Sequence, residues 1–300
     1  MAPAPPLHLR LPATSANLGP GFDALGLAMS LYLTIDATAS EVSTIQATGR
    51  DAALCATLED NLILTTYASI LYQAGREATP LSLRLNNEIP LGMGCGSSAA
   101  ALLAGVLLAN HFGGLGWTSQ QILEDACHRE GHPDNVAACW LGGMTASSMS
   151  NGEVTTATFG DKLPWRLILA IPPASLSTTK ARALLPATYS RMDAVANVQN
   201  TALLVSAFAL DRPEILRTAM ADHLHQPYRQ QACPLLPLLL PLANEAGVYG
   251  VALSGAGPSV LLIADPHLPI ATIARAARVA AEDPGLEIIA TTISGGSEIS

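Results

Sequence analysis

A glycine-rich segment carries the pattern best suited to phosphate chemistry in this chain. Glycines alternate with other residues and lead directly into Ser97, Ser98 and an Ala- and Leu-rich run that predicts a helix to Asn110. Alternating glycines let successive backbone N–H groups turn inward, and a helix that begins here adds unpaired N–H groups and the positive end of its dipole. The segment therefore predicts a phosphate-binding loop, with an ordinary strand-to-helix turn as the alternative. It consists of Pro90, Leu91, Gly92, Met93, Gly94, Cys95, Gly96, Ser97, Ser98, Ala99 and Ala100.

Two common nucleotide-binding loops do not fit this segment. A Walker A loop requires a lysine directly after a glycine, and neither lysine of the chain, Lys162 or Lys180, follows one. A dinucleotide-binding loop requires an acidic residue about 20 positions further on. After Glu88 the next acidic residue is Glu124, which is too far away. The segment therefore indicates a phosphate loop of another kind.

A second group of polar residues lies between positions 128 and 135. His128 and His132 are four residues apart, as zinc ligands on a helix often are, but Gly131 and Pro133 break a regular helical face. This spacing makes a metal-dependent hydrolase a poor interpretation. Glu130, Asp134 and Asn135 stand in the same stretch and offer oxygen ligands and hydrogen-bonding groups.

The glycine-rich segment resembles the phosphate loop of the GHMP kinases, the superfamily of galactokinase, homoserine kinase, mevalonate kinase and phosphomevalonate kinase. It differs by Cys95 where that motif has a leucine, and a buried cysteine is a small apolar substitute. Residues 12–26 resemble the first motif of the superfamily and residues 253–260 resemble the third, so the resemblance extends over nearly the whole chain. The third motif contains a further glycine loop: Ser254, Gly255, Ala256 and Gly257.

This resemblance implies an α+β fold of two domains. The expected N-terminal, ATP-binding domain is similar to ribosomal protein S5 and comprises residues 1–155. The expected C-terminal domain is ferredoxin-like and comprises residues 156–300. The site is expected between them.

Within the superfamily, residues 131–137 are similar to the homoserine kinase signature, and residues 177–182 and 222–229 are similar to its arginine-bearing segments. The resemblance implies ATP-dependent phosphorylation of L-homoserine to O-phospho-L-homoserine, a step toward threonine. L-Homoserine is a zwitterion, whose carboxylate suits a guanidinium fork and whose ammonium suits carboxylates. The resemblance implies that the arginines bind the carboxylate and that the aspartates bind the ammonium. It implies that Asn17 and Asn135 bind the hydroxyl and that His132 binds either the carboxylate or the hydroxyl. The implied substrate-binding residues are Asn17, Asp23, His132, Asp134, Asn135, Arg182 and Arg229.

The resemblance also assigns ATP to the glycine-rich segment and Mg²⁺ to Ser98 and Glu130. With Asn17 and Asn135, these form the expected catalytic set. Glu130 stands only two residues before His132, whereas some homoserine kinases separate the two by several residues. Some superfamily members pair a catalytic Asp with a Lys. Because Asn135 stands near that place and lysines are scarce, we expect the substrate hydroxyl to lose its proton late, to phosphate or to water.

Two alternatives stay open. One is another small-molecule kinase of the superfamily, of the mevalonate type. Mevalonate has no ammonium group, so Asp23 and Asp134 would have no role there. The other is a catalytically inactive sensor on the same fold, in which loss of Ser98 or Glu130 would be expected, yet both are present.

Strands and helices that position these groups follow from hydrophobic periodicity and from breaker residues. Residues 13–23 are rich in Gly, Pro and small polar side chains and are expected to form a loop. Thr118 with Gln121 predicts a capped helix start. The strong turn-forming stretch between Gly142 and Pro164 predicts the domain boundary. Strands are expected at residues 7–12, 31–37, 42–47, 81–85, 166–171, 249–254, 260–264 and 286–293, and further helices at 61–75, 194–209, 212–224 and 270–282.

Composition limits the remaining possibilities. The 300 residues are 49% hydrophobic and only 13% charged, which argues against intrinsic disorder. A net charge of −9 argues against a general nucleic-acid binder. Five scattered cysteines without a C-x-x-C pair, and no recognisable signal peptide, favour the cytoplasm. No apolar run reaches the about 18 residues of a membrane span, so no membrane partner is expected; the resemblance alone suggests a homodimer.

Overall fold

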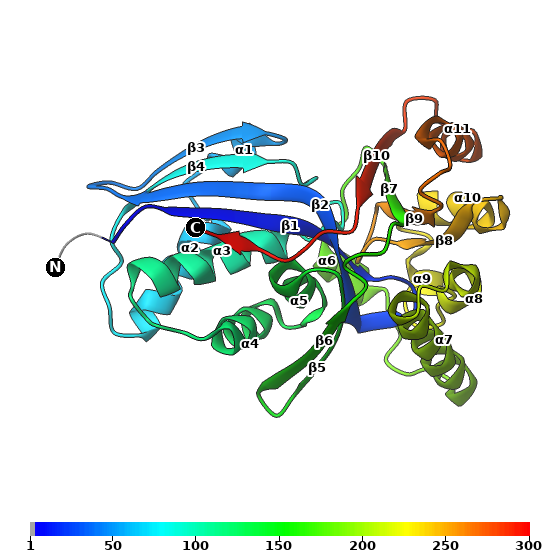
Figure 1. Ribbon diagram of the computed structural model, residues 1–300, viewed down its shortest axis with the longest axis horizontal. Helices are drawn as coiled ribbons and strands as arrows, with labels where there is room; N and C mark the ends of the chain where they lie inside the picture. Colours follow the sequence, from blue (N-terminus) through cyan, green and yellow to red (C-terminus); the bar gives the residue numbers. More distant parts are fainter. Residues whose placement is uncertain (1–3) are drawn as a thin grey trace.

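The computed structural model describes residues 4–300 and contains two β-sheets that lie end to end (Figure 1). The first sheet has seven strands in the order β11-β1-β2-β4-β3, with β5 and β6 continuing from β2. Helices cover one of its faces, and α3 and α5 pack directly on β1 and β2. The strands of this sheet are β1 (Leu7–Asn17), β2 (Gly21–Ala39), β3 (Thr44–Gly49), β4 (Leu81–Asn87), β5 (Met144–Ser150), β6 (Glu153–Phe159) and β11 (Glu298–Ile299), and its helices are α1 (Ala52–Cys55), α2 (Leu62–Gln73), α3 (Ser97–Phe112), α4 (Ser119–Glu130) and α5 (Asp134–Leu141).

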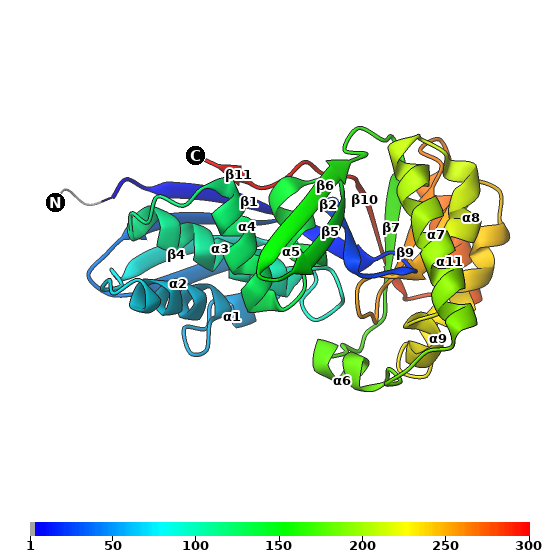
Figure 2. The same cartoon turned by 90° about the horizontal axis from the view of Figure 1, so that it is seen from below.

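The second sheet is antiparallel, with the strand order β10-β7-β9-β8. Helices pack beside it, and α6 lies near the boundary between the two halves of the molecule (Figure 2). Its strands are β7 (Arg166–Ile171), β8 (Val248–Leu253), β9 (Val260–Ala264) and β10 (Glu287–Thr292). The helical segments of this half are α6 (Thr178–Ala183), α7 (Arg191–Ala209), η1 (Pro213–Ile215), α8 (Leu216–Ala219), α9 (Gln226–Arg229), α10 (Leu235–Leu239), η2 (Leu240–Asn244) and α11 (Ile270–Ala280).

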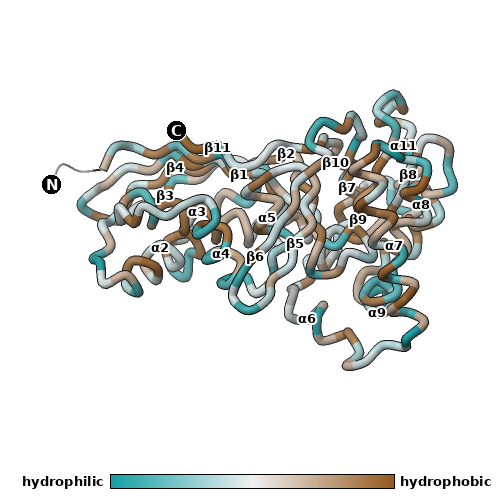
Figure 3. Tube along the Cα trace, turned by 60° about the horizontal axis from the view of Figure 1, so that its bottom comes forward, coloured by the Kyte–Doolittle hydropathy of each residue, from teal (hydrophilic) through white to brown (hydrophobic). Residues whose placement is uncertain are grey.

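The continuous apolar segments form the centre of each layer. β7 is buried from Leu167 to Ile171, as expected of a strand covered on both faces. α3 is buried along most of its length beneath the first sheet. Hydrophobic residues accordingly concentrate along α3 and along β7 and β9 (Figure 3). Within residues 4–300, no helix combines the length and the apolar character needed to cross a bilayer.

Several predicted elements are confirmed. The strand at residues 166–171 has the predicted bounds, and Thr118 begins α4 with a reciprocal capping box to Gln121. The mixed α+β class with two sheets is also confirmed. The division at residue 155 stays a prediction: β6 contains that position, and the chain passes between the sheets after Phe159. The last strand, β11, returns to pair with β1.

Two local predictions are wrong, and one pair of strands was not expected. Residues 13–23 are not a continuous loop, because β1 continues to Asn17 and β2 begins at Gly21. Buried Thr14 and Ser15 form part of this strand pair, so that only residues 18–20 turn. The helix expected at 212–224 ends at Ala219, since the chain turns there toward Asp222. The hairpin of β5 and β6 was not predicted, because its Ser- and Thr-rich strands look like linker.

Candidate active site

One cavity of about 700 Å³ lies where the two halves of the molecule meet, and residues from all three sequence motifs line it. The first motif provides Asn17 and Asp23, the glycine-rich segment provides the wall beside α3, and Arg182 and Arg229 come from the second half. The lining residues are Ala16, Asn17, Phe22, Asp23, Gly92, Gly94, Cys95, Gly96, Ser97, Ser98, Ala99, Glu130, His132, Asp134, Asn135, Leu176, Arg182, Arg229, Gly255, Ala256 and Gly257.

The glycine-rich segment needs its glycines for both conformation and space. Gly92, Gly94 and Gly96 all adopt positive φ, between 70° and 75°. A Cβ at Gly94 would collide with the Ser254 carbonyl, and one at Gly96 would collide with the Thr14 side chain. The glycine-rich segment therefore packs directly against the first and third motifs. Gly96 provides no side chain to cap α3, which leaves the first N–H groups of the helix available to an anion at the cavity wall.

Four residues predicted to bind ATP lie outside this cavity. Ala100 is fully buried in the core, Met93 packs against the core, and Pro90 is buried. Leu91 faces a neighbouring cavity. Cys95 lines the site but is almost fully buried, and burial raises the pKa of its thiol to about 12. It therefore serves as an apolar packing group.

A polar cluster at the start of α5 centres on the buried carboxylate of Asp134. Its Oδ1 accepts hydrogen bonds from His132 Nδ1 at 2.6 Å and from the Asn135 backbone N–H at 2.6 Å. The Thr14 hydroxyl donates to Asn135 Oδ1 at 2.7 Å, so Asn135 has mainly its amide N–H groups to offer a ligand. Burial alone would lower the pKa of His132, but the hydrogen bond and charge of Asp134, together with Glu130 and Asp23, raise it.

Asp23 and Arg182 meet on one side of the cavity. Two charge-assisted hydrogen bonds, of 2.7 and 2.9 Å, join the carboxylate to the guanidinium. Asp23 also lies near the cluster described above: a ligand atom of Asp23, one of His132 and one of Asp134 are within 4.8 Å of one another. Asn17, with a positive φ of 68°, accepts from the Asp23 backbone N–H and donates to the Gly255 carbonyl. Asn17 therefore ties the first motif to the third and contributes little free hydrogen-bonding capacity.

Arg229 is a buried cation that forms no ion pair with the carboxylates of the described residues. Only 2% of the residue is exposed, and its hydrogen-bond partners are the Ala181 and Gly255 carbonyls and the His225 ring, all uncharged acceptors. Within residues 4–300 no carboxylate forms an ion pair with it. Burial, then the charge of Arg182, lowers the pKa of Arg229, although a guanidinium keeps its proton at any physiological pH. A buried charge without a counter-ion is unfavourable, so this position favours an anionic ligand.

Phe22 is a cavity residue that sequence reasoning missed. Its ring centroid lies 5.4 Å from the Arg182 guanidinium carbon and 5.5 Å from that of Arg229. A cation over an aromatic face is stabilised electrostatically, so Phe22 helps to hold both guanidinium groups at the cavity. The available signal was its place within the first motif, next to Asp23.

Glu130 and Ser98 present hard oxygen ligands to the same cavity. Burial is the main cause that raises the pKa of Glu130, and the neighbouring His132 opposes that shift. Within the described residues no Lys or Arg forms an ion pair with Glu130. A carboxylate and a hydroxyl beside the glycine-rich segment match the ligands that Mg²⁺ prefers, so these residues fit the ion.

A second cavity adjoins the glycine-rich segment on the other side. Its walls are largely apolar, with a few polar groups, and its empty volume is about 920 Å³. Leu91 and Ser97 of the glycine-rich segment line it. No sequence motif pointed to it. Its lining comes from β2, β4, α2, α3 and the chain around α1: Leu33, Leu54, Cys55, Thr57, Glu59, Asp60, Asn61, Leu62, Ile63, Leu85, Asn87, Ile89, Leu91, Ser97 and Ala101.

Comparison with known proteins agrees with this arrangement. Residues 61–143 match the GHMP kinases N-terminal domain, and residues 204–282 match the GHMP kinases C-terminal domain. The chain is 48% identical to a homoserine kinase of Solibacter usitatus over 85% of this chain and 84% of that protein. It also resembles the crystal structure of homoserine kinase from Cytophaga hutchinsonii, with a TM-score of 0.82, 25% identity, and coverage of 98% of this chain and 97% of that one. A mevalonate kinase structure from L. major shares the fold at 16% identity, a TM-score of 0.69 and 95% coverage of both chains.

The chain is therefore a member of the GHMP kinase superfamily, whose two domain models together match more than half of it. Within that superfamily it belongs to the homoserine kinase family, because the identity is high over most of both chains. The likeness to mevalonate kinase is one of fold alone.

Proposed function

We propose that this enzyme transfers the γ-phosphoryl group of ATP to the side-chain hydroxyl of L-homoserine. A bond forms between the hydroxyl oxygen and the γ-phosphorus while the bond from that phosphorus to the β–γ bridging oxygen breaks. The products are O-phospho-L-homoserine, ADP and one proton. The family membership reported above supports this reaction, and the charges of the cavity support the acceptor.

One observation carries the choice of acceptor: a buried guanidinium, to which no carboxylate of residues 4–300 is paired, lies beside an ion pair that faces the same cavity. Arg229 favours a carboxylate, and Arg182 offers a second fork next to it. Asp23, together with nearby Asp134, favours an ammonium group. A small zwitterion satisfies both requirements at once. We propose that its carboxylate contacts the arginines and its ammonium contacts the aspartates.

For ATP, we propose that the phosphates lie against the N–H groups of the glycine-rich segment and the start of α3. The apolar second cavity would hold the adenine, because Leu91 and Ser97 connect it directly to that segment. Asn61 and Asn87 are among the polar groups in its wall. An apolar slot with a few polar groups is the usual environment of a planar base.

We propose that Ser98 and Glu130 hold Mg²⁺. When bound, the ion neutralises charge on the β- and γ-phosphate oxygens. The two side chains hold it beside the phosphate loop. Catalysis of phosphoryl transfer depends mainly on such positioning and on charge neutralisation, because the transition state is loose.

Asn135 is the side chain that we propose to orient the acceptor hydroxyl. Thr14 and Asp134 hold the amide of Asn135 on two sides. We also propose that Asn17 contacts the hydroxyl, with the hydrogen-bonding capacity of its amide that the Gly255 carbonyl does not use. Among the described residues that line the cavity there is no lysine. We therefore propose that the hydroxyl proton leaves late, to a phosphate oxygen or to water.

The experiment that tests this function is a measurement of ADP release with Mg²⁺ and ATP and a panel of acceptors. L-Homoserine should give turnover at least tenfold above L-serine, L-threonine, mevalonate and galactose. A higher rate with mevalonate would favour the mevalonate-type alternative. ADP release that no acceptor stimulates would favour the inactive sensor.

We also propose that the enzyme works in the cytoplasm. All five cysteines are free thiols in the structure, and four of them are buried. A chain with this many unpaired thiols suits a reducing compartment. The expected homodimer stays a prediction.

A further inference from the structure

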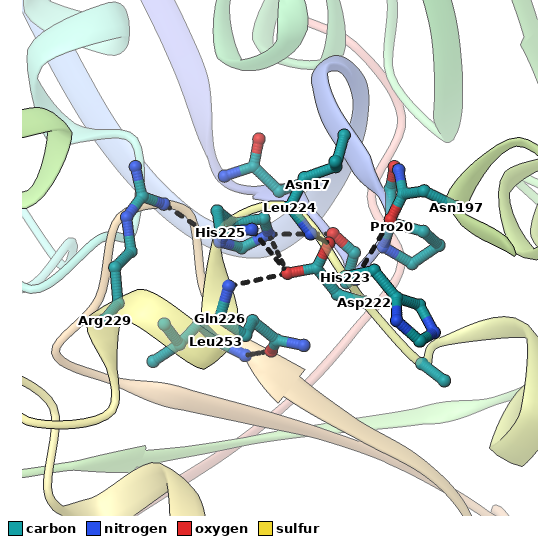
Figure 4. A network of polar contacts seen from close by, with 12 residues as sticks. Asn17, Pro20, Asn197, Asp222, His223, Leu224, His225, Gln226, Arg229 and Leu253 are labelled. Carbon is teal, nitrogen blue, oxygen red and sulfur yellow. Dashed lines mark hydrogen bonds and ion pairs between the residues drawn. The ribbon is translucent and has the colours of Figure 1, made fainter. Parts of the chain in front are cut away.

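A buried histidine holds one of the arginines of the proposed carboxylate site (Figure 4). His225 is fully buried, directly before α9, and its ring lies 5.4 Å from the ring of Phe22. The nearest guanidinium nitrogen of Arg229 lies 3.0 Å from His225 Nδ1, and His225 Nε2 lies 2.8 Å from the Gly19 carbonyl oxygen. The proposed mechanism assigns no role to this ring.

These two contacts require one protonation state of the ring. A guanidinium has donors only, so His225 Nδ1 must accept and carries no proton. The Gly19 carbonyl has acceptors only, so His225 Nε2 must donate. The ring is therefore neutral, with its hydrogen on Nε2. Burial lowers the pKa of His225; the Asp222 carboxylate opposes this shift and the Arg229 cation adds to it. The lowered pKa agrees with the neutral form.

The backbone on either side of the ring is also held. The Asp222 carboxylate accepts the backbone N–H groups of Leu224, His225 and Gln226 at 2.9, 2.9 and 2.6 Å. The Gln226 side chain accepts the backbone N–H of Leu253 at 2.7 Å, which joins the start of α9 to β8. Arg229 follows one helical turn later, with its N–H bonded to the His225 carbonyl. His225 therefore has little freedom to move away from Arg229.

We propose that His225 is a positioning residue for substrate recognition: its unprotonated Nδ1 holds the Arg229 guanidinium in the orientation that receives the substrate carboxylate. This inference rests on the proposed function. The charged groups that face the ring are Asp222, whose Oδ2 lies 3.5 Å from the proton-bearing Nε2, Asp23 on β2 and Arg229 itself. Protonation of Nδ1 would place a ring N–H against an N–H of the Arg229 guanidinium. Arg229 would then lose this acceptor and face a second positive charge.

Two substitutions test the roles of the two ring nitrogens separately. In His225→Asn the amide oxygen takes the place of Nδ1 and still accepts from Arg229, without titrating near neutral pH. In His225→Gln the amide nitrogen takes the place of Nε2 and donates to Gly19, while the acceptor for Arg229 is lost. His223→Gln is the matched control, because that ring is half exposed and lies outside the cavity.

We expect His225→Gln to raise the KM for L-homoserine roughly 10-fold or more, as for loss of a hydrogen bond to a charged group, with the KM for ATP unchanged. The KM for L-homoserine of His225→Asn should be at least fivefold lower than that of His225→Gln. The KM of His223→Gln should equal that of the parent. As pH falls below about 6.5, the parent's KM for L-homoserine should rise more steeply than that of His225→Asn. The comparison of pH profiles between the parent and His225→Asn tests the proposal even if His225→Gln does not fold.

Equal KM values for the Gln and Asn variants, or parallel pH profiles for the parent and His225→Asn, would overturn the positioning role. Failure of the proposed function gives a different result: the parent itself would show no ADP release that depends on L-homoserine. A rise in the KM for ATP in step with that for L-homoserine would also overturn the inference, since it would indicate general damage.

Discussion

Arg182 on α6 and Asp23 on β2, 159 residues apart in sequence, form a two-pronged ion pair at the wall of the cavity. The two side chains were expected to contact opposite ends of one zwitterion. In the structure they contact each other, and each is partly exposed. A zwitterion placed between them gives Asp23 an ammonium and Arg182 a carboxylate, so neither charge is left without a partner.

The arginines should govern affinity for the acceptor and not for ATP. Arg229→Ala and Arg182→Ala should each weaken L-homoserine binding by about 1.5–3 kcal/mol, which is roughly 10- to 150-fold. Lysine should rescue either position poorly, because an ammonium does not reproduce a bidentate fork. Separate titrations of ATP and L-homoserine test this. Arg217→Ala, on the short helix α8 and outside the cavity, is a control. The assignment fails if both variants bind L-homoserine like the parent.

Asp23 should select for the ammonium group. Asp23→Asn removes its negative charge, so we expect the preference for L-homoserine over 4-hydroxybutyrate, which lacks the ammonium, to fall at least tenfold. The ratio of kcat/KM for the two acceptors measures this preference. Asp36→Asn is the control, since Asp36 pairs with His8 away from the cavity. An unchanged ratio would place the ammonium elsewhere.

Glu130 should affect turnover more than acceptor binding. Glu130→Gln keeps the shape but removes the charge that we propose to hold Mg²⁺, so kcat should fall by orders of magnitude while the affinity for L-homoserine stays nearly intact. Initial rates over a Mg²⁺ titration, with calorimetry for L-homoserine, test this. Glu124→Gln, on the same helix but outside the cavity, should leave the rate unchanged. Normal turnover in Glu130→Gln would remove Glu130 from the site.

Gly94 should be intolerant of a single methyl group. Gly94 and Gly152 both have positive φ, 75° and 83°, so alanine at either position costs about 1–2 kcal/mol of backbone strain. Only at Gly94 would the new Cβ collide, with the Ser254 carbonyl, whereas Gly152 has open space. Gly94→Ala should therefore lower the melting temperature further than Gly152→Ala and should also weaken ATP binding. Equal effects of the two substitutions on both measurements would contradict the close packing of the motifs.

His225 should make the folded state less stable at acid pH. Its pKa in the folded protein is lower than in the unfolded chain, so the unfolded chain binds the proton first as pH falls below about 6.5. Above that pH the neutral ring makes its full contribution to the free energy of unfolding. It declines as pH falls toward the lower, folded-state pKa, by at most about 1.4 kcal/mol per pH unit. Urea unfolding of the parent and of His225→Asn between pH 8 and 5 compares the slopes; equal slopes would show that another group dominates.

The amino-acid sequence alone determined the parts of this protein that depend on short-range geometry. The glycine turn that leads into α3 could be predicted from residues 90–100, because positive φ at glycine and the unpaired N–H groups of a helix start are local properties. The strand at residues 166–171 and the capping box at Thr118 follow from local pattern in the same way. Candidate charges of the cavity could be identified from motifs, but not their partners.

Only the tertiary structure decided how those charges are compensated. Asp23 lies near Arg182, and Arg229 lies among neutral acceptors beside His225, because β2, α6 and α9 meet at one cavity. Residues 13–17, which include the polar Thr14 and Ser15, likewise form a buried strand paired with β2 and not the expected loop. Desolvation and pairing depend on which segments surround a group in space, and residue type and spacing along the chain do not specify those neighbours.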